Sequence, residues 1–177
     1  MITKQKLCSI ALASTAMILM LMSIAGGTPF VYITNSGSNN VSVIDTATNT
    51  VTATVSVGYN PLGVTVSPDG TNIYVANEYN NTVSVINPAA NSITSTVNVE
   101  NDPWGVAVIP DGTKVYVINL NTNNVYVINT TTNTVSATVP VGSQPYGVSV
   151  TQDGKKVDVM NEDGTVSAID TATNTTA

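Results

Sequence analysis

The chain contains no histidine and no arginine, and its single cysteine, Cys8, lies near the amino terminus. Histidine is the usual general base and the commonest metal ligand, and arginine is the usual partner of phosphate groups. Without cysteine beyond Cys8, the rest of the chain has no disulfide, thiolate nucleophile or thiolate ligand. We therefore expect a protein that is not an enzyme and that holds no cofactor and no metal.

Charge and aromatic side chains are also scarce. Charged residues make up 9% of the chain and aromatic residues 5%, and the formal net charge is −6. Binding to nucleic acid or to an anionic membrane surface depends on clustered positive charge, so neither is expected as a partner. Threonine, asparagine, valine, serine and glycine fill most of the remainder, which is typical of an all-β protein.

The amino-terminal segment has the pattern of an export signal. Lys4 and Lys6 precede an apolar run from Leu7 to Ala25, and Ser23-Ile24-Ala25 places small residues before a cleavage point at Gly26. The pattern predicts a helical signal peptide over 1–25, a mature domain over 26–177, and a secreted or cell-surface protein. An uncleaved anchor is the alternative, because a run of about 19 apolar residues is roughly long enough to cross a bilayer.

A repeated phrase sets the fold class. It begins at Pro61, Pro103 and Pro145, a spacing of 42 residues, and each copy has glycine two residues later. Asp-Gly pairs return with the same spacing. A period of about 40 to 45 residues with short strands is typical of β-propeller blades. The chain divides into repeats near 30–60, 61–102, 103–144 and 145–177.

Each period contains four short segments with strand patterns, separated by turn residues. In the second repeat these are Gly63–Ser67, Asn72–Asn77, Thr82–Asn87 and Ser92–Val99. Four antiparallel strands make one propeller blade, which buries its faces by stacking on neighbouring blades. We expect two whole blades and two partial ones, over Gly63–Val99, Gly105–Val141, Phe30–Val57 and Gly147–Asp170 respectively.

The strand that carries tyrosine resembles the YVTN-type β-propeller repeat. Tyr74-Val75-Ala76-Asn77 and Tyr116-Val117-Ile118-Asn119 match its central phrase, and Ser67-Pro68-Asp69-Gly70 is similar to its turn. The last copy departs from it, with Val157-Asp158-Val159-Met160 in place of the tyrosine strand. The resemblance implies an exported or surface-layer protein; related propellers include a few lactonase-like enzymes.

The array is incomplete at about 3.5 blades, since propellers usually close with about 4 to 8. The first blade is expected to lack its inner strand and the last its outer strand. Unpaired strand edges and uncovered blade faces promote association. We therefore expect a homo-oligomer or an incomplete propeller; a fragment of a larger propeller gene is the alternative.

One end of the blades gathers the most unusual side chains. Loops that enter each blade share a face with the loops between the second and third strands, because successive strands are antiparallel. The candidate binding residues there are Tyr59, Leu62, Tyr79, Trp104, Gln144 and Tyr146. Leu62, Trp104 and Tyr146 occupy equivalent positions, so packing between blades is the alternative role for them.

The function expected from the sequence is that of a cell-surface or envelope module with a binding or structural role. Its ligand would be a protein or a surface polymer. A lactonase-like hydrolase is the alternative in another class, and the lack of histidine and of an acid cluster disfavours it.

Overall fold

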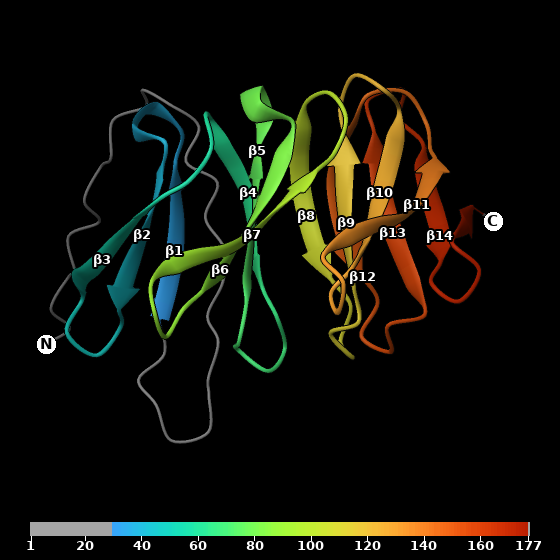
Figure 1. The fold of residues 1–177 in the computed structure, drawn as a ribbon. Helices are drawn as coiled ribbons and strands as arrows, with labels where there is room; N and C mark the ends of the chain where they lie inside the picture. Colours follow the sequence, from blue (N-terminus) through green and yellow to red (C-terminus); the bar gives the residue numbers. More distant parts are fainter. Residues whose placement is uncertain (1–29, 177) are drawn as a thin grey trace, which may run out of the picture.

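The computed structural model describes residues 30–176, where fifteen strands form four antiparallel sheets (Figure 1). Valine, isoleucine and threonine are frequent in these strands because β-branched side chains pack well on a pleated surface. The predicted signal peptide over 1–25 lies outside the described residues. Within them, no helix is long and apolar enough to span a bilayer.

Each sheet is one blade, and its strands are neighbours in chain order. Blade 1 consists of β1 (Phe30–Asn35), β2 (Asn40–Asp45) and β3 (Thr50–Ser56). Blade 2 consists of β4 (Pro61–Val66), β5 (Ile73–Asn77), β6 (Thr82–Asn87) and β7 (Ser92–Asn98). Blade 3 consists of β8 (Pro103–Val108), β9 (Lys114–Asn119), β10 (Asn124–Asn129) and β11 (Thr134–Pro140). Blade 4 consists of β12 (Pro145–Val150), β13 (Lys156–Asn161), β14 (Val166–Asp170) and β15 (Thr175–Thr176).

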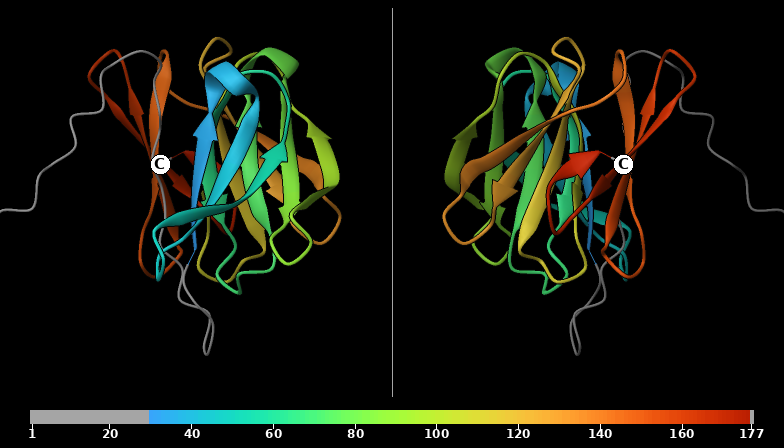
Figure 2. Two further views of the ribbon diagram at one scale, coloured as in Figure 1. Left: turned by 90° about the vertical axis from the view of Figure 1, so that its left-hand side faces the viewer. Right: turned by 90° about the vertical axis from the view of Figure 1, so that its right-hand side faces the viewer.

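The blades stand side by side in an arc, with β4, β8 and β12 as the inner strands of the last three (Figure 2). The four sheets do not close into a ring. This arrangement confirms the all-β propeller-type repeat with an incomplete arc. It also confirms that blade 1 has three strands and no inner strand among the described residues.

Two details differ from the expectation. The last blade does have an outer strand, because Thr175 and Thr176 pair with Asp170 and Ile169. Two short 3-10 helices, η1 (Ser36–Ser38) and η2 (Glu78–Asn80), also occur where only strands and turns were expected. Each precedes an asparagine in the left-handed region, Asn39 and Asn81, which redirects the chain into the next strand.

The core consists of three apolar clusters, one between each pair of neighbouring blades. Tyr74 and Tyr116 are fully buried in two of them. Blade 4 has no neighbour on its other face among the described residues, and there Met160 and Val166 are 46% and 63% exposed. Packing of blade on blade therefore accounts for the core, as the repeat predicts.

The Asp-Gly pairs form turns. In the turn between β4 and β5, the Ser67 hydroxyl and the Thr71 main-chain N–H both donate to Asp69 Oδ1, at 2.6 and 3.0 Å. Gly70 follows with φ of 71°, which glycine adopts without steric cost. The aspartate is thus saturated by its own turn, as expected for a turn former.

Candidate functional site

The candidate site lies at the end of the blades that carries the entry loops and the loops between second and third strands. We call this end the loop face. Blades are joined here by a repeated bond: a left-handed asparagine in one blade accepts a hydrogen bond from a main-chain N–H in the next. The main-chain N–H groups of Asn60, Asp102 and Gln144 donate to the side-chain oxygens of Asn39 (3.0 Å), Asn81 (3.2 Å) and Asn123 (2.8 Å), respectively.

A cavity of about 570 Å³ opens on the loop face between blades 3 and 4. Its lining is formed by Trp104, Leu120, Gln144, Tyr146 and Glu162. The structure therefore brings together three of the six predicted residues, Trp104, Gln144 and Tyr146. Trp104 packs partly on the apolar cluster between these blades, while Tyr146 is 47% exposed.

The main chain fixes the walls of this cavity. Gln144 has φ of 49°, and its N–H is held by Asn123, so its side chain starts from a defined backbone position. The N–H of Glu162 donates to the carbonyl oxygens of Ser143 and Gln144, at 3.0 and 3.2 Å. The N–H of Leu120 donates to the carbonyl oxygen of Asp102 at 3.2 Å. The loops that form the cavity are therefore held in place by hydrogen bonds of their main-chain N–H groups.

Leu120 and Glu162 were missed by the sequence argument. Both directly follow the asparagine that ends a second strand, Asn119 or Asn161, and Glu78 has the same position in blade 2. This position varies between repeats in the way that Leu62, Trp104 and Tyr146 vary. That variation was a usable signal, because a position whose chemistry changes while its neighbours repeat is not needed for the blade itself.

The other three predicted residues lie elsewhere. Tyr59 and Tyr79 are 61% and 71% exposed and adjoin each other on blade 2, where the Tyr79 N–H donates to the Tyr59 carbonyl oxygen at 3.3 Å. Leu62 is only 2% exposed, and its carbonyl oxygen accepts a bond of 2.7 Å from the Thr34 hydroxyl. Burial leaves the Leu62 side chain unable to contact a ligand and fits the alternative of packing between blades.

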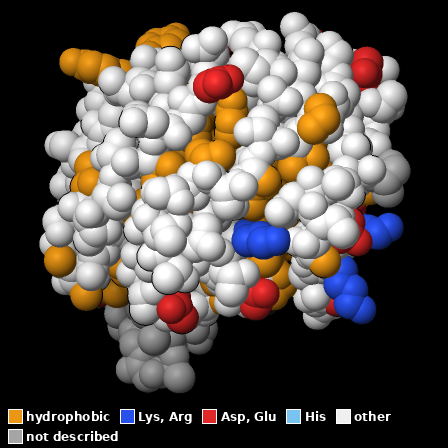
Figure 3. Space-filling view, turned by 45° about the vertical axis from the view of Figure 1, so that its right-hand side comes forward, with side chains coloured by type: hydrophobic (Ala, Val, Ile, Leu, Met, Phe, Trp, Pro, Cys, Tyr) orange, Lys and Arg blue, Asp and Glu red, His pale blue; other side chains and the backbone are white. Residues whose placement is uncertain are grey.

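Among the described residues, the acidic groups on the loop face form no metal-binding cluster. Burial raises the pKa of the Glu78 carboxyl, and the negative charge of Asp102 adds to this, while a hydrogen bond from Asn60 opposes it. In residues 30–176 no three acidic, histidine or cysteine side chains are close enough to hold a metal ion. Figure 3 shows one side of the molecule, on which charged side chains are scattered and hydrophobic ones lie in a furrow.

The inner side of the arc carries a second, more apolar hollow of about 560 Å³. Val106, Val108, Val148 and Val150, from the inner strands β8 and β12, form much of its wall. Its polar side chains, Thr65, Ser149, Thr151 and Gln152, adjoin no aromatic ring, whereas Gln144 and Glu162 of the loop-face cavity lie with Trp104 and Tyr146. The loop-face cavity is therefore the better candidate for specific binding.

Comparison with known proteins agrees with this fold. The chain is similar to a solved chain of hydrazine synthase from Kuenenia stuttgartiensis, with a TM-score of 0.82, 26% sequence identity and coverage of 89% of this chain. It is also 60% identical over 38 residues to the PE-PGRS family protein PE_PGRS18 of Mycobacterium tuberculosis, a match to 22% of this chain.

Both relatives are longer than the matched part. The alignment covers 47% of the hydrazine synthase chain and 8% of the mycobacterial protein. A model of one protein family, described as the YNCE-like β-propeller, matches residues 3–114, which is more than half of the chain. The propeller blades seen in the structure agree with that match, and the chain belongs to the YNCE-like β-propeller family.

Proposed function

We propose that this chain is an exported β-propeller module of the YVTN type, acting at the cell surface and binding a polymer on its loop face without transforming it. The observation that carries the proposal is the cavity in which Trp104, Tyr146 and Gln144 meet Glu162. Its position at the junction of two blades gives a ligand contacts from both. The β-propeller fold itself is compatible with a binding or a structural module.

The lining favours a neutral, polar polymer such as a polysaccharide. Tryptophan and tyrosine offer flat apolar faces on which a sugar ring can stack, and their N–H and O–H groups can bond water or ligand at the same time. The Gln144 amide and the Glu162 carboxylate, both on exposed residues, can bond hydroxyl groups. A few polar groups beside aromatic walls are the usual composition of a specific small-ligand site.

Absence of catalysis is part of the proposal. A lactonase-like reaction requires a general base or a metal to activate water, and the sequence has no histidine for either task. Among residues 30–176, no three acids lie close enough together to hold a metal ion that could activate water. Lactone hydrolysis by the purified chain that is lost in Glu162→Gln would contradict this part and would favour the hydrolase.

Export is supported by the Lys4/Lys6 start and the Ser23-Ile24-Ala25 pattern. The mature protein should be recovered outside the cytoplasm with an amino terminus near Gly26. Amino-terminal sequencing of that fraction provides the measurement. A recovered protein that still begins at Met1 and stays with the membrane would favour an anchor.

Polymer binding can be followed with the intrinsic fluorescence of Trp104, because the chain has one tryptophan. We expect cell-envelope polysaccharide to shift this emission in a saturable way and Tyr146→Ala to weaken binding about tenfold, or about 1.4 kcal/mol. Tyr79→Ala is the matched control, since Tyr79 is exposed on the same face but outside the cavity. Equal effects of the two variants, or no saturable shift, would overturn the proposal.

A further inference from the structure

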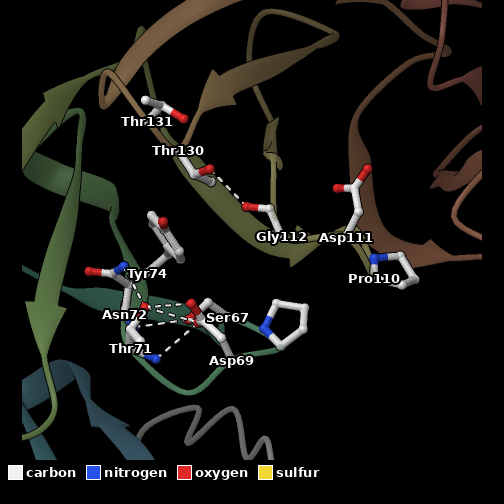
Figure 4. Close-up of a pocket in the computed structure, with 11 residues that line it drawn as sticks. Ser67, Asp69, Thr71, Asn72, Tyr74, Pro110, Asp111, Gly112, Thr130 and Thr131 are labelled. Atoms are coloured by element: carbon white, nitrogen blue, oxygen red, sulfur yellow. Dashed lines mark hydrogen bonds between the residues drawn. The ribbon is translucent and has the colours of Figure 1, made fainter.

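A separate cavity lies between blades 2 and 3 at the opposite end of the molecule. We call this end the turn face, because it carries the turns between β4 and β5 and between β8 and β9. The cavity has a volume of about 440 Å³, and its walls include Asp69, Asn72 and Tyr74 of blade 2 and Asp111 and Thr130 of blade 3. Figure 4 shows the residues of blade 2 on one side of it and those of blade 3 on the other.

The next junction, between blades 3 and 4, contains a lysine at the equivalent place. Lys114 follows Asn72 by one period of 42 residues, and its Nζ donates to the carbonyl oxygen of Thr171 and to Asn174 Oδ1, the latter at 3.2 Å. The Tyr116 hydroxyl donates to the same Asn174 oxygen at 3.1 Å. Two acceptors from blade 4 thus hold the lysine ammonium group beside a buried tyrosine.

The acceptors of that ammonium site are repeated between blades 2 and 3. Tyr74 corresponds to Tyr116, and Asn133 corresponds to Asn174, since the last repeat is one residue shorter. Both asparagines are left-handed, with φ of 52° and 55°, and each N–H closes its turn with a bond of 2.8 Å, to Asn129 or Asp170. Thr130 corresponds to Thr171, and both threonine hydroxyls donate to the glycine carbonyl oxygen of the facing turn.

The lysine ammonium group itself has no counterpart between blades 2 and 3. Asn72 is too short to replace Lys114, and its Nδ2 donates to Thr71 Oγ1 at 3.1 Å within its own turn. None of the residues that line the cavity is a lysine. Asn133 Oδ1, the counterpart of the oxygen that bonds Lys114 and Tyr116, is buried and accepts no hydrogen bond. A buried acceptor without a donor costs stability, and Asn133 itself lies behind the residues that line the cavity rather than among them.

The charge of the cavity fits a cation. Hydrogen bonds from Ser67 and Thr71 hold the pKa of the Asp69 carboxyl below its usual range, so that it is ionised at neutral pH. Burial, together with the negative charge of Asp69, raises the pKa of the Tyr74 phenol and keeps it protonated. Asp111 adds a second acid to the wall. The site therefore combines neutral oxygen acceptors with uncompensated negative charge.

We propose that this cavity binds a primary alkylammonium group, which takes the place that Lys114 Nζ occupies one blade later. The ammonium would donate to the Thr130 carbonyl oxygen, as Lys114 Nζ donates to that of Thr171, next to the Tyr74 hydroxyl, with Asp69 and Asp111 balancing its charge. The alkyl chain would leave through the open side of the cavity. The site is on the turn face and does not depend on polymer binding at the loop face.

The test titrates the chain with n-butylammonium and, as an uncharged match of the same length, n-butanol, following the amide resonances of residues 67–74 and 130–133 by NMR. Saturable shifts with the amine alone, at one equivalent per chain, are expected. No saturation, or equal effects of the two probes, would overturn the proposal. Displacement of the amine by equimolar Na⁺ or Ca²⁺ would also overturn it, because a general cation site would then be present.

Two exchanged variants make the test specific. Asn72→Lys supplies the missing ammonium from within the chain and should weaken n-butylammonium binding at least tenfold while raising the thermal midpoint, whereas Asn72→Gln should retain binding. Lys114→Asn recreates the open arrangement between blades 3 and 4 and should raise the stoichiometry from one amine to two. Unchanged binding in Asn72→Lys would contradict the proposal even if Lys114→Asn fails to fold.

The same site could receive a free amine or a lysine side chain of another protein, and the chemistry of recognition is shared. Comparison of n-butylammonium with Nα-acetyl-lysine methylamide distinguishes them. Tighter binding of the lysine derivative supports the site and indicates a protein-borne ammonium, while tighter binding of the simple amine supports the site and indicates a diffusible one. Binding of neither compound contradicts the proposal.

Discussion

A β-carbon added to Gly63 would lie 2.5 Å from the main-chain carbonyl oxygen of Trp104 in the next blade. The inner strands β4 and β8 approach each other this closely because glycine leaves room for the neighbouring backbone. At Gly105, one period later, the nearest atom is instead Cδ1 of Ile118 in the same blade, at 2.9 Å, and Val148 Cγ1 of the next blade lies at 3.3 Å. The glycine of the Pro-x-Gly phrase is thus required by the backbone of the next blade at Gly63, and by neighbouring side chains at Gly105.

We expect Gly63→Ala to lower the free energy of unfolding by about 1–3 kcal/mol, because a carbonyl oxygen in a paired strand has no room to move. Urea unfolding gives the measurement. Gly37→Ala is the matched control, since a β-carbon there would meet no atom within 4 Å. That change should be neutral or slightly stabilising through the unfolded chain. Equal losses in the two variants would contradict the close approach.

Asn123 supports the junction of blades 3 and 4 through its left-handed backbone conformation and through its side-chain hydrogen bond, and two substitutions distinguish these contributions. Its φ is 55°, and its Oδ1 accepts the bond from the Gln144 N–H. Asn123→Gly removes the bond but still allows the left-handed conformation, and should lower the free energy of unfolding by about 1 kcal/mol. Asn123→Ala also forces alanine into the left-handed region and should lower it by roughly 1–2 kcal/mol more. Equal stability of the two variants would show that the conformation contributes nothing.

The buried tyrosines make the fold sensitive to alkali. Burial raises the pKa of Tyr116 and of Tyr126 to about 12, and nearby carboxylates add to the shift, from Asp111 and Asp170 for Tyr116 and from Glu100 for Tyr126. The unfolded chain ionises at the ordinary value of 10.0, so it loses protons before the folded chain does. The free energy of unfolding should therefore be unaffected by these groups below pH 10 and should fall between pH 10 and about 12.

This alkaline loss can be measured by urea unfolding at a series of pH values, with phenolate absorbance recorded in parallel. Tyr126→Phe has no group to ionise and should show a shallower decline above pH 10 than the unsubstituted chain. An identical decline in the two proteins would mean that Tyr126 does not contribute.

The uncovered face of blade 4 should drive self-association. Met160 and Val166 are exposed on it, and burial of apolar surface is worth about 25 cal/mol per Å² before the costs of association. We expect light scattering to show oligomers at micromolar concentration and Val166→Ser to shift the population toward smaller species. Val51→Ser is the control, because Val51 is also exposed, at 58%, but lies on an outer strand of blade 1. A monomer at every concentration would contradict the expectation.

Much of the fold followed from local sequence. The 42-residue spacing of Pro61, Pro103 and Pro145 located the blades, and the alternation of apolar and polar residues located the strands between turns. These features depend on neighbours in the chain, so they are visible without a structure. The outer strand Thr175–Thr176 escaped because two residues are too few to show a periodic pattern.

The candidate sites depended on contacts between blades, which no single repeat contains. Sequence placed Trp104, Gln144 and Tyr146 on one face, but only packing of blade 4 on blade 3 put them around one cavity, whereas Leu62 of blade 2 is buried. Likewise, the difference between Asn72 and Lys114 is visible in the sequence. Only the structure shows what this difference means, because the acceptors come from the following blade. Lys114 is bonded to Asn174, whereas Oδ1 of Asn133, the counterpart of Asn174, is buried without a donor.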